Sequence, residues 1–365
     1  MRRGSPRRID TVEAGAVAGG AAVLDSSMKQ LEAFTLGKKV GQPEANEDSL
    51  VIMPGRGYAV IDGVTARNET RYGAMLPGQF ASRTVQKATE RYILAQSDVA
   101  QPALHYRGAV PFISYLTQAM RDAYAAHGRL DAVTADWKLR GGCTIMAALM
   151  VGDRLEIAAV GDSGIRINGR DTLQVLKPLD DVTSILRREA WQVFAARGEP
   201  EEVCDRLAGL LTWQGTRNQP AGSATADPAA IANIEARALQ AARAHLPKAP
   251  QDEVLLLIRD GIANGQGKFQ NVVEPYFGYG GIDGFPIPER HVESRSYALA
   301  EIETIELFSD GYFKLGDGFG VAAWEAAFAE VEAEDPHKIG RYMSTKGTTP
   351  TILTDDRSYL GIRLK

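Results

Sequence analysis

Cysteine and histidine are scarce in this chain, which has 2 cysteines and 5 histidines among 365 residues. Cys143 and Cys204 are too few for a disulfide framework, and with the scattered histidines they supply no cluster of zinc ligands. Each cysteine falls among apolar residues, which favours burial in a core. The sequence therefore indicates a reduced, cytoplasmic protein without a zinc site.

The chain also lacks an excess of positive charge and a long apolar run. Its 41 basic and 46 acidic residues give a net charge of −5, which argues against a nucleic-acid partner, because nucleic-acid binders carry basic surfaces. No run reaches the roughly 18 apolar residues that span a bilayer, so no membrane partner is expected. The arginine-rich start resembles a signal peptide, but Asp10 and Glu13 interrupt it. We interpret residues 1–30 as a flexible tail.

Residues 31–365 have the pattern of a single domain that mixes strands and helices. Apolar residues recur at helical spacing in residues 77–96 and 110–127, which predicts two amphipathic helices. Residues 177–250 change to helical patterning throughout, and we interpret them as a helical insertion in a sheet domain. A short apolar run at residues 253–258 predicts a return to strand.

Two short apolar runs separated by a Pro-Gly-Arg turn signal predict a hairpin. The first, residues 49–53, follows Asn46-Glu47-Asp48, and the second, residues 57–64, contains Asp62 and Gly63 near its end. In an antiparallel hairpin the start of the first strand and the end of the second lie side by side at the same end of the hairpin, which we call this edge of the sheet. Three carboxylates at one edge repel each other unless a cation lies among them, which favours a divalent cation there.

The same pattern, an acid at the boundary of an apolar strand, recurs later in the chain. It is found in Gly161-Asp162-Ser163, in Ser309-Asp310-Gly311 and in Asp355-Asp356. A single Asp-Gly is a common turn, and the copies at Asp260, Asp283 and Asp317 have no strand leading into them. The recurring arrangement, placed on one edge of one sandwich, is what predicts a metal site.

The order of these motifs resembles that of the protein phosphatase 2C (PPM) family, in its bacterial type. The matching residues are Asn-Glu-Asp at 46–48, Val-Ile-Asp-Gly-Val at 60–64, Gly-Gly-Cys-Thr at 141–144, Val-Gly-Asp-Ser at 160–163, Phe-Ser-Asp-Gly at 308–311 and Asp-Asp-Arg-Ser at 355–358. The resemblance covers residues 31–365 apart from the helical block. It implies an α/β (α+β) fold, a four-layer α/β/β/α sandwich of two mostly antiparallel sheets flanked by helices, with metal ions between the sheets.

The resemblance also implies roles for individual residues. Asp62 would bridge two Mn²⁺ or Mg²⁺ ions, with the Gly63 carbonyl on one of them and with Asp310 and Asp355 on the other. Glu47 and Asp48 would hold metal-bound waters, and Asp162 matches the residue associated with a third, weaker metal. Oxygen ligands of this kind suit hard divalent ions.

By the same resemblance, the chain is a phosphoric monoester hydrolase, a protein serine/threonine phosphatase. Two ions about 3.5–4 Å apart activate a bridging water and clamp the phosphoryl oxygens for in-line attack. Asp62, Asp310 and Asp355 are then the catalytic residues, and the partners are a phosphoprotein and a cognate kinase. The alternative cysteine-phosphatase pattern Cys-x5-Arg is absent, since Leu149 and Leu210 stand at the arginine positions.

The chain departs from the family pattern in two places. Many members carry a phosphate-binding arginine shortly before the Glu-Asp pair, whereas residues 42–45 here contain none. The basic residues available to replace it are Lys38, Lys39, Arg67 and Arg71. A histidine that some members have after Asp-Gly is replaced by Val64. These gaps leave two alternatives open: a phosphatase of a small phosphate ester, and a phosphatase-like regulatory protein without turnover. Retention of Asp62, Asp310 and Asp355 argues against the second. The oligomeric state is not indicated.

Overall fold

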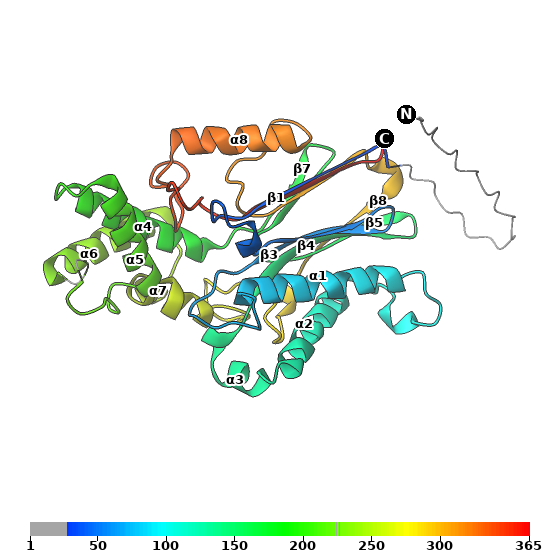
Figure 1. The fold of residues 1–365 in the computed structure, drawn as a ribbon, viewed down its shortest axis with the longest axis horizontal. Helices are drawn as coiled ribbons and strands as arrows, with labels where there is room; N and C mark the ends of the chain where they lie inside the picture. The colour runs from blue at the N-terminus through cyan, green and yellow to red at the C-terminus, as the bar shows by residue number, and fades with distance from the viewer. Residues whose placement is uncertain (1–27, 224, 226) are drawn as a thin grey trace, which may run out of the picture.

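Two five-stranded antiparallel sheets form the centre of the molecule (Figure 1). The computed structural model describes residues 28–223, 225 and 227–365. The first sheet has the order β1 (Gln30–Leu36), β10 (Arg357–Arg363), β9 (Thr304–Phe308), β6 (Gly164–Ile167) and β7 (Asp171–Leu173). The second has the order β2 (Ser49–Met53), β3 (Gly57–Gly63), β4 (Cys143–Val151), β5 (Arg154–Val160) and β8 (Glu293–Ala298).

Helices cover the outer faces of both sheets. Figure 1 shows α8 (Val321–Glu334) on the first sheet, and α1 (Pro77–Ala95) and α2 (Ala109–Ala126) on the second. The short α3 (Leu130–Ala135) follows α2. The predicted four-layer α/β/β/α sandwich is confirmed, as are the two predicted amphipathic helices to within a residue or two.

The central strands β3 and β4 are buried on both faces, and their side chains divide between two cores. In β3, Tyr58 and Val60 belong to the core between the sheets, whereas Ala59 and Ile61 belong to the core under α1 and α2. This division follows from the two-residue period of a strand. The inter-sheet core also receives Leu307 of β9, so both sheets are held face to face by apolar burial.

The helical insertion lies at one end of the sandwich and has a core of its own (Figure 1). Within the predicted range 177–250 lie α4 (Pro178–Ala195), α5 (Glu201–Gln214) and α6 (Pro228–His245), and the helical block continues beyond that range with α7 (Gln251–Gly265), which shares the same core. The strand predicted at residues 253–258 is wrong, because these residues belong to α7. A short apolar run does not distinguish a buried strand from a helix, but Val254, Leu257 and Ile258 are buried at helical spacing.

The predicted hairpin is confirmed, with Ser49 of β2 opposite Ile61 of β3. The prediction for the N-terminal part of the chain is mostly untested. Residues 1–27, which contain most of the expected tail and the segment that resembles a signal peptide, lie outside the described residues, and β1 begins at Gln30. Among the helices of the described part, none has the length and hydropathy needed to cross a membrane.

Candidate active site

The sandwich brings the predicted acids to one end of the two sheets. Glu47 and Asp48 immediately precede β2, and Asp62 is the last residue but one of β3. The remaining acids flank other strands of the two sheets: Asp162 follows β5, Asp310 follows β9 and Asp355 precedes β10. Both sheets therefore contribute carboxylates to the same edge, as the recurring sequence pattern predicts.

Glycines allow the chain segments to approach closely at this edge. A Cβ on Gly63 would lie 2.5 Å from the Glu47 carbonyl oxygen and 2.7 Å from that of Gly78, so no side chain fits there. Gly161 has a φ of +90° and its added Cβ would lie 2.4 Å from the Thr144 side chain. Glycine is the residue that tolerates both conditions. These positions fix the backbone beside Asp62 and Asp162.

Hydroxyl groups of the motifs join the strand ends to each other. The Thr144 and Ser163 hydroxyl oxygens lie 2.9 Å apart, and the Ser358 N–H donates to Ser309 Oγ at 2.9 Å. The Ser358 hydroxyl donates to Asp48 Oδ2 at 2.7 Å. The serines and the threonine in the motifs therefore fix the turns that carry the acids, which explains why they accompany the acids in the sequence.

A cavity of about 330 Å³ opens over this edge. Asp62, Asp162, Asp310 and Asp355 line it, together with the backbone of Gly63. The helical insertion supplies another part of the wall, through Ser184 of α4, Trp213 of α5 and Ile262 of α7. The insertion is therefore part of the candidate site.

Two of the acids in the cavity have no basic partner. Asp62 and Asp310 form no ion pair within the part of the chain that the structure describes. Burial, followed by Asp48 for the first and by Asp62 for the second, raises the pKa of both carboxyls well above the usual value. Burial, with Asp356 as the next cause, also raises the pKa of Asp48 to about 8. Carboxylates in this state favour a bound cation.

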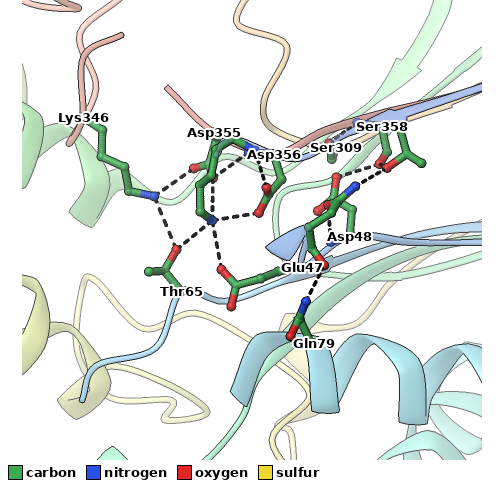
Figure 2. A network of polar contacts seen from close by, with 12 residues as sticks. Glu47, Asp48, Thr65, Gln79, Ser309, Lys346, Asp355, Asp356 and Ser358 are labelled. Carbon is green, nitrogen blue, oxygen red and sulfur yellow. Dashed lines mark hydrogen bonds and ion pairs between the residues drawn. The ribbon is translucent and has the colours of Figure 1, made fainter. Parts of the chain in front are cut away.

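Lys38 forms ion pairs with three other acids, Glu47, Asp355 and Asp356. Its Nζ lies 3.0 Å from Glu47 Oε2, 3.2 Å from Asp355 Oδ1 and 2.8 Å from Asp356 Oδ2. Figure 2 shows these carboxylates and Thr65 directed toward one nitrogen. Although burial opposes the charge, the three carboxylates raise the pKa of Lys38 well above its usual value. Lys38 is therefore a charged, buried structural group.

Two further lysines reach the acids from the cavity side. Lys346 Nζ lies 3.4 Å from Asp355 Oδ2 (Figure 2), and Lys177 Nζ lies 2.8 Å from Asp162 Oδ2. Burial opposes ionisation of Asp355 less than Lys346 and Lys38 favour it, so its pKa is lowered. The acids at this edge thus fall into two groups, one paired with lysines and one without a cation.

The donor atoms present suit a hard divalent ion. Glu47 Oε1, Asp48 Oδ1 and Asp162 Oδ1 are buried carboxylate oxygens without a hydrogen-bond partner. Within the described ranges, no three acidic, histidine or cysteine side chains close around one point. Mg²⁺ does not require such a cage, since it keeps several waters and binds through one or two carboxylates. Asp162, whose Oδ1 is one of these oxygens, lines the cavity together with Asp62 and Asp310.

The expected phosphate-binding residues are placed differently from one another. Arg67 lines the cavity and its guanidinium lies 5.1 Å from the centroid of the Trp137 ring. Lys39 pairs with Ile352 in a backbone bridge, and Arg71 is exposed and donates to the Ala74 carbonyl. Neither is among the residues that line the cavity.

Three residues of the site are not identified by the sequence motifs. Lys177 and Lys346 belong to no motif, and Asp356 stands out only as the second acid of a pair. The double acid at 355–356 was an available signal, because two adjacent buried carboxylates require a cation nearby. It does not reveal that the cation is Lys38, which lies 318 residues away from Asp356 in the chain.

No protein-family model matches this chain, and no curated protein matches it. One solved structure with a similar arrangement is the catalytic domain of the serine/threonine phosphatase PstP in complex with two manganese ions. Its sequence is 14% identical, and the match covers 92% of this chain and 97% of that chain at a TM-score of 0.41. The serine/threonine phosphatase Stp1 from Staphylococcus aureus is 12% identical in sequence, and the match covers 96% of this chain and 100% of that chain at a TM-score of 0.41. PppA from Pseudomonas aeruginosa is 11% identical in sequence, and the match covers 92% of this chain and 96% of that chain at a TM-score of 0.37.

Proposed function

We propose that this protein is a metal-dependent phosphatase that hydrolyses phosphoserine or phosphothreonine in proteins. The observation that carries the proposal is the position of Asp62 and Asp310, which come from different sheets, line one cavity and have no basic partner among the described residues. A pair of buried carboxylates with raised pKa values is costly to ionise. A divalent ion removes this cost.

The acids of the site would have different roles in this function. Asp62, Asp310 and the Gly63 carbonyl would hold the ions, with Asp355 beside them and Asp162 at the margin of the cavity. Divalent ions bound there would supply the chemistry of a hydrolase, a lowered pKa of bound water and neutralisation of phosphoryl oxygens. Glu47 and Asp48 are not among the residues that line the cavity; one oxygen of each contacts Lys38 or Ser358, and the other, buried and without a partner, would accept a hydrogen bond from a metal-bound water.

The cavity geometry is compatible with a substrate larger than a phosphate group. Its wall includes Trp213 and Ile262 of the insertion as well as Met343 and Phe313, so apolar surface adjoins the carboxylates. A side chain or a backbone next to a phosphorylated residue would contact that wall, which supports a protein substrate. A cognate kinase would be the other partner of the system.

The test is hydrolysis of 4-nitrophenyl phosphate with Mn²⁺, Mg²⁺ or EDTA. We expect wild type to need a divalent ion and Asp62→Ala to lose at least roughly 100-fold in kcat/KM, because metal stabilisation is worth several kcal/mol and about 1.4 kcal/mol is tenfold. Asp317→Ala is the matched control, another Asp-Gly aspartate whose side chain is 83% exposed. A panel of phosphopeptides then tests the protein substrate.

A second candidate, a phosphatase-like regulatory protein, is favoured by the pairing of both Asp355 oxygens with lysines. The two candidates differ in one result. Wild type that neither binds Mn²⁺ in titration calorimetry nor hydrolyses the aryl phosphate or any phosphopeptide would contradict the enzyme and support the regulatory protein.

A further inference from the structure

More acidic than basic residues line the cavity although its proposed substrate is an anion. Six aspartates line it, against three basic residues, Arg67, Lys177 and Lys346. Bound divalent ions would offset the acids, but a phosphate group also requires hydrogen-bond donors to its oxygens. The donor expected before the Glu-Asp pair is missing from residues 42–45. The three basic residues in the cavity are the charged donors that could take its place.

Two of these residues are already engaged by other groups. Lys177 Nζ lies 2.8 Å from Asp162 Oδ2 and 3.5 Å from Asp180 Oδ2. Arg67 donates to Gln270 Oε1 at 3.4 Å, and its guanidinium lies over the Trp137 ring. Withdrawing either side chain toward a ligand would break these contacts.

Lys346 also forms only long contacts, and unlike Arg67 it lies against Asp355, one of the acids of the proposed metal site. Its Nζ contacts Thr65 Oγ1 and Asp355 Oδ2, each at 3.4 Å, which is long for a hydrogen bond. An ammonium group has three N–H donors, so at least one remains for a ligand. The side chain is 28% exposed and lines the cavity.

Lys38 is a useful contrast to Lys346, because both lysines contact Asp355 and Thr65 (Figure 2). Lys38 Nζ has four acceptors within 3.2 Å, and its side chain is only 8% exposed. All its donors are used inside the protein. Of the two ammonium groups, only that of Lys346 is open to the cavity.

The segment that carries Lys346 is held in place. It connects α8 to β10, and its first residue, Asp335, accepts the backbone N–H groups of Ile339, Gly340 and Tyr342. Arg187 of α4 donates to the His337 carbonyl at 2.6 Å and pairs with Asp205 of α5 at 2.7 Å. The helical insertion thus fixes one end of the segment, which reduces the entropy that Lys346 loses on binding a ligand.

We propose that Lys346 binds the phosphate group of the substrate, in place of the arginine that is missing before the Glu-Asp pair. The inference rests on the proposed function and adds to it a substrate-binding residue from the segment between α8 and β10. Lys346 approaches the phosphate from the Asp355 side of the cavity and donates one or more hydrogen bonds to its oxygens.

The experiment compares wild type, Lys346→Met, Lys346→Arg and the control Lys314→Met. Lys314 has a matched exposure of 30% and pairs with Asp317 and Glu330 outside the cavity. Titration calorimetry measures binding of inorganic phosphate to the Mg²⁺-saturated protein and, separately, binding of Mn²⁺ to the metal-free protein. Steady-state kinetics with 4-nitrophenyl phosphate give KM and kcat.

We expect Lys346→Met to raise the Kd for phosphate and the KM by about 10-fold to 100-fold, the usual range for a hydrogen bond to a charged group. The affinity for Mn²⁺ should stay the same or increase, because a positive charge next to Asp355 is removed. Lys346→Arg should restore most of the phosphate affinity, and Lys314→Met should behave as wild type.

Three results would overturn the inference: unchanged phosphate binding in Lys346→Met, equal losses of Mn²⁺ and phosphate binding that indicate a structural role, or no phosphate binding in wild type. The proposed function fails separately, if wild type binds phosphate but hydrolyses no phosphate ester. In that case the loss of phosphate binding in Lys346→Met would still establish the residue as the anion-binding group.

Discussion

The carboxylates at this end of the sheets form two sets with different neighbours. Asp62 and Asp310 have no ion-pair partner among the described residues, and burial raises the pKa of both. Glu47, Asp355 and Asp356 instead share the ammonium group of Lys38. Both sets of acids come from strand boundaries and look alike in the sequence. The charge of an acid in the second set is balanced by the chain itself, whereas Asp62 and Asp310 have no such partner among the described residues.

The largest effect is expected for the second set, from Lys38→Met. Removing one partner of a buried ion pair leaves uncompensated charges and costs about 3–5 kcal/mol. Urea unfolding in EDTA measures the loss. Lys314→Met, which breaks a more exposed pair, should cost about 0–1 kcal/mol. If Lys38→Met were as stable as the control, Lys38 would not be the group that neutralises these acids.

An effect of up to about 4 kcal/mol over three pH units is expected from pH on the metal-free protein. The pKa of Asp48 is raised from its usual 3.8 to about 8. The stability linked to this group is therefore fully present below pH 3.8 and is lost as the pH rises through about 8. We expect the free energy of unfolding in EDTA to fall between pH 5 and pH 8, by at most about 1.4 kcal/mol per pH unit for this group.

Two changes should alter this pH dependence of stability if Asp48 causes it. Asp48→Asn should flatten the dependence, and saturating Mn²⁺ should reduce it, because a bound cation stabilises the ionised carboxylates. Urea unfolding at each pH provides the data. An Asp48→Asn protein with the same pH dependence as wild type would show that Asp48 titrates normally.

The smallest effect concerns the hydrogen bond that orients Asp48. Ser358→Ala removes the donor that lies 2.7 Å from Asp48 Oδ2. We expect a loss of about 1–2 kcal/mol in stability, because a buried acceptor is left without its partner. Ser97→Ala, at an exposed serine, should stay within about 0.5 kcal/mol of wild type. Equal stability of the two variants would mean that another group takes over the Asp48 oxygen.

Much of the fold could be predicted from the sequence, because the signals are local. The hairpin of β2 and β3 follows from two apolar runs and a turn signal, and its register places Asp48 and Asp62 at one edge. The helical pattern of α1 and α2 is equally direct. The run at 253–258 was misassigned because its six residues are too few to distinguish a strand from a helix, although Pro250 just before it is a common helix start.

The sequence by itself determined which residue types stand at the strand ends, since a strand that stops on an acid is a local property of the chain. Only the tertiary structure decided which of those acids have a cation. Lys38 lies 9 residues from Glu47 but 318 from Asp356, and Lys346 lies 281 from Thr65. No local rule relates residues so far apart. Their charges interact only because two sheets and a clamped segment bring them within about 4 Å of each other, where burial makes the interaction strong.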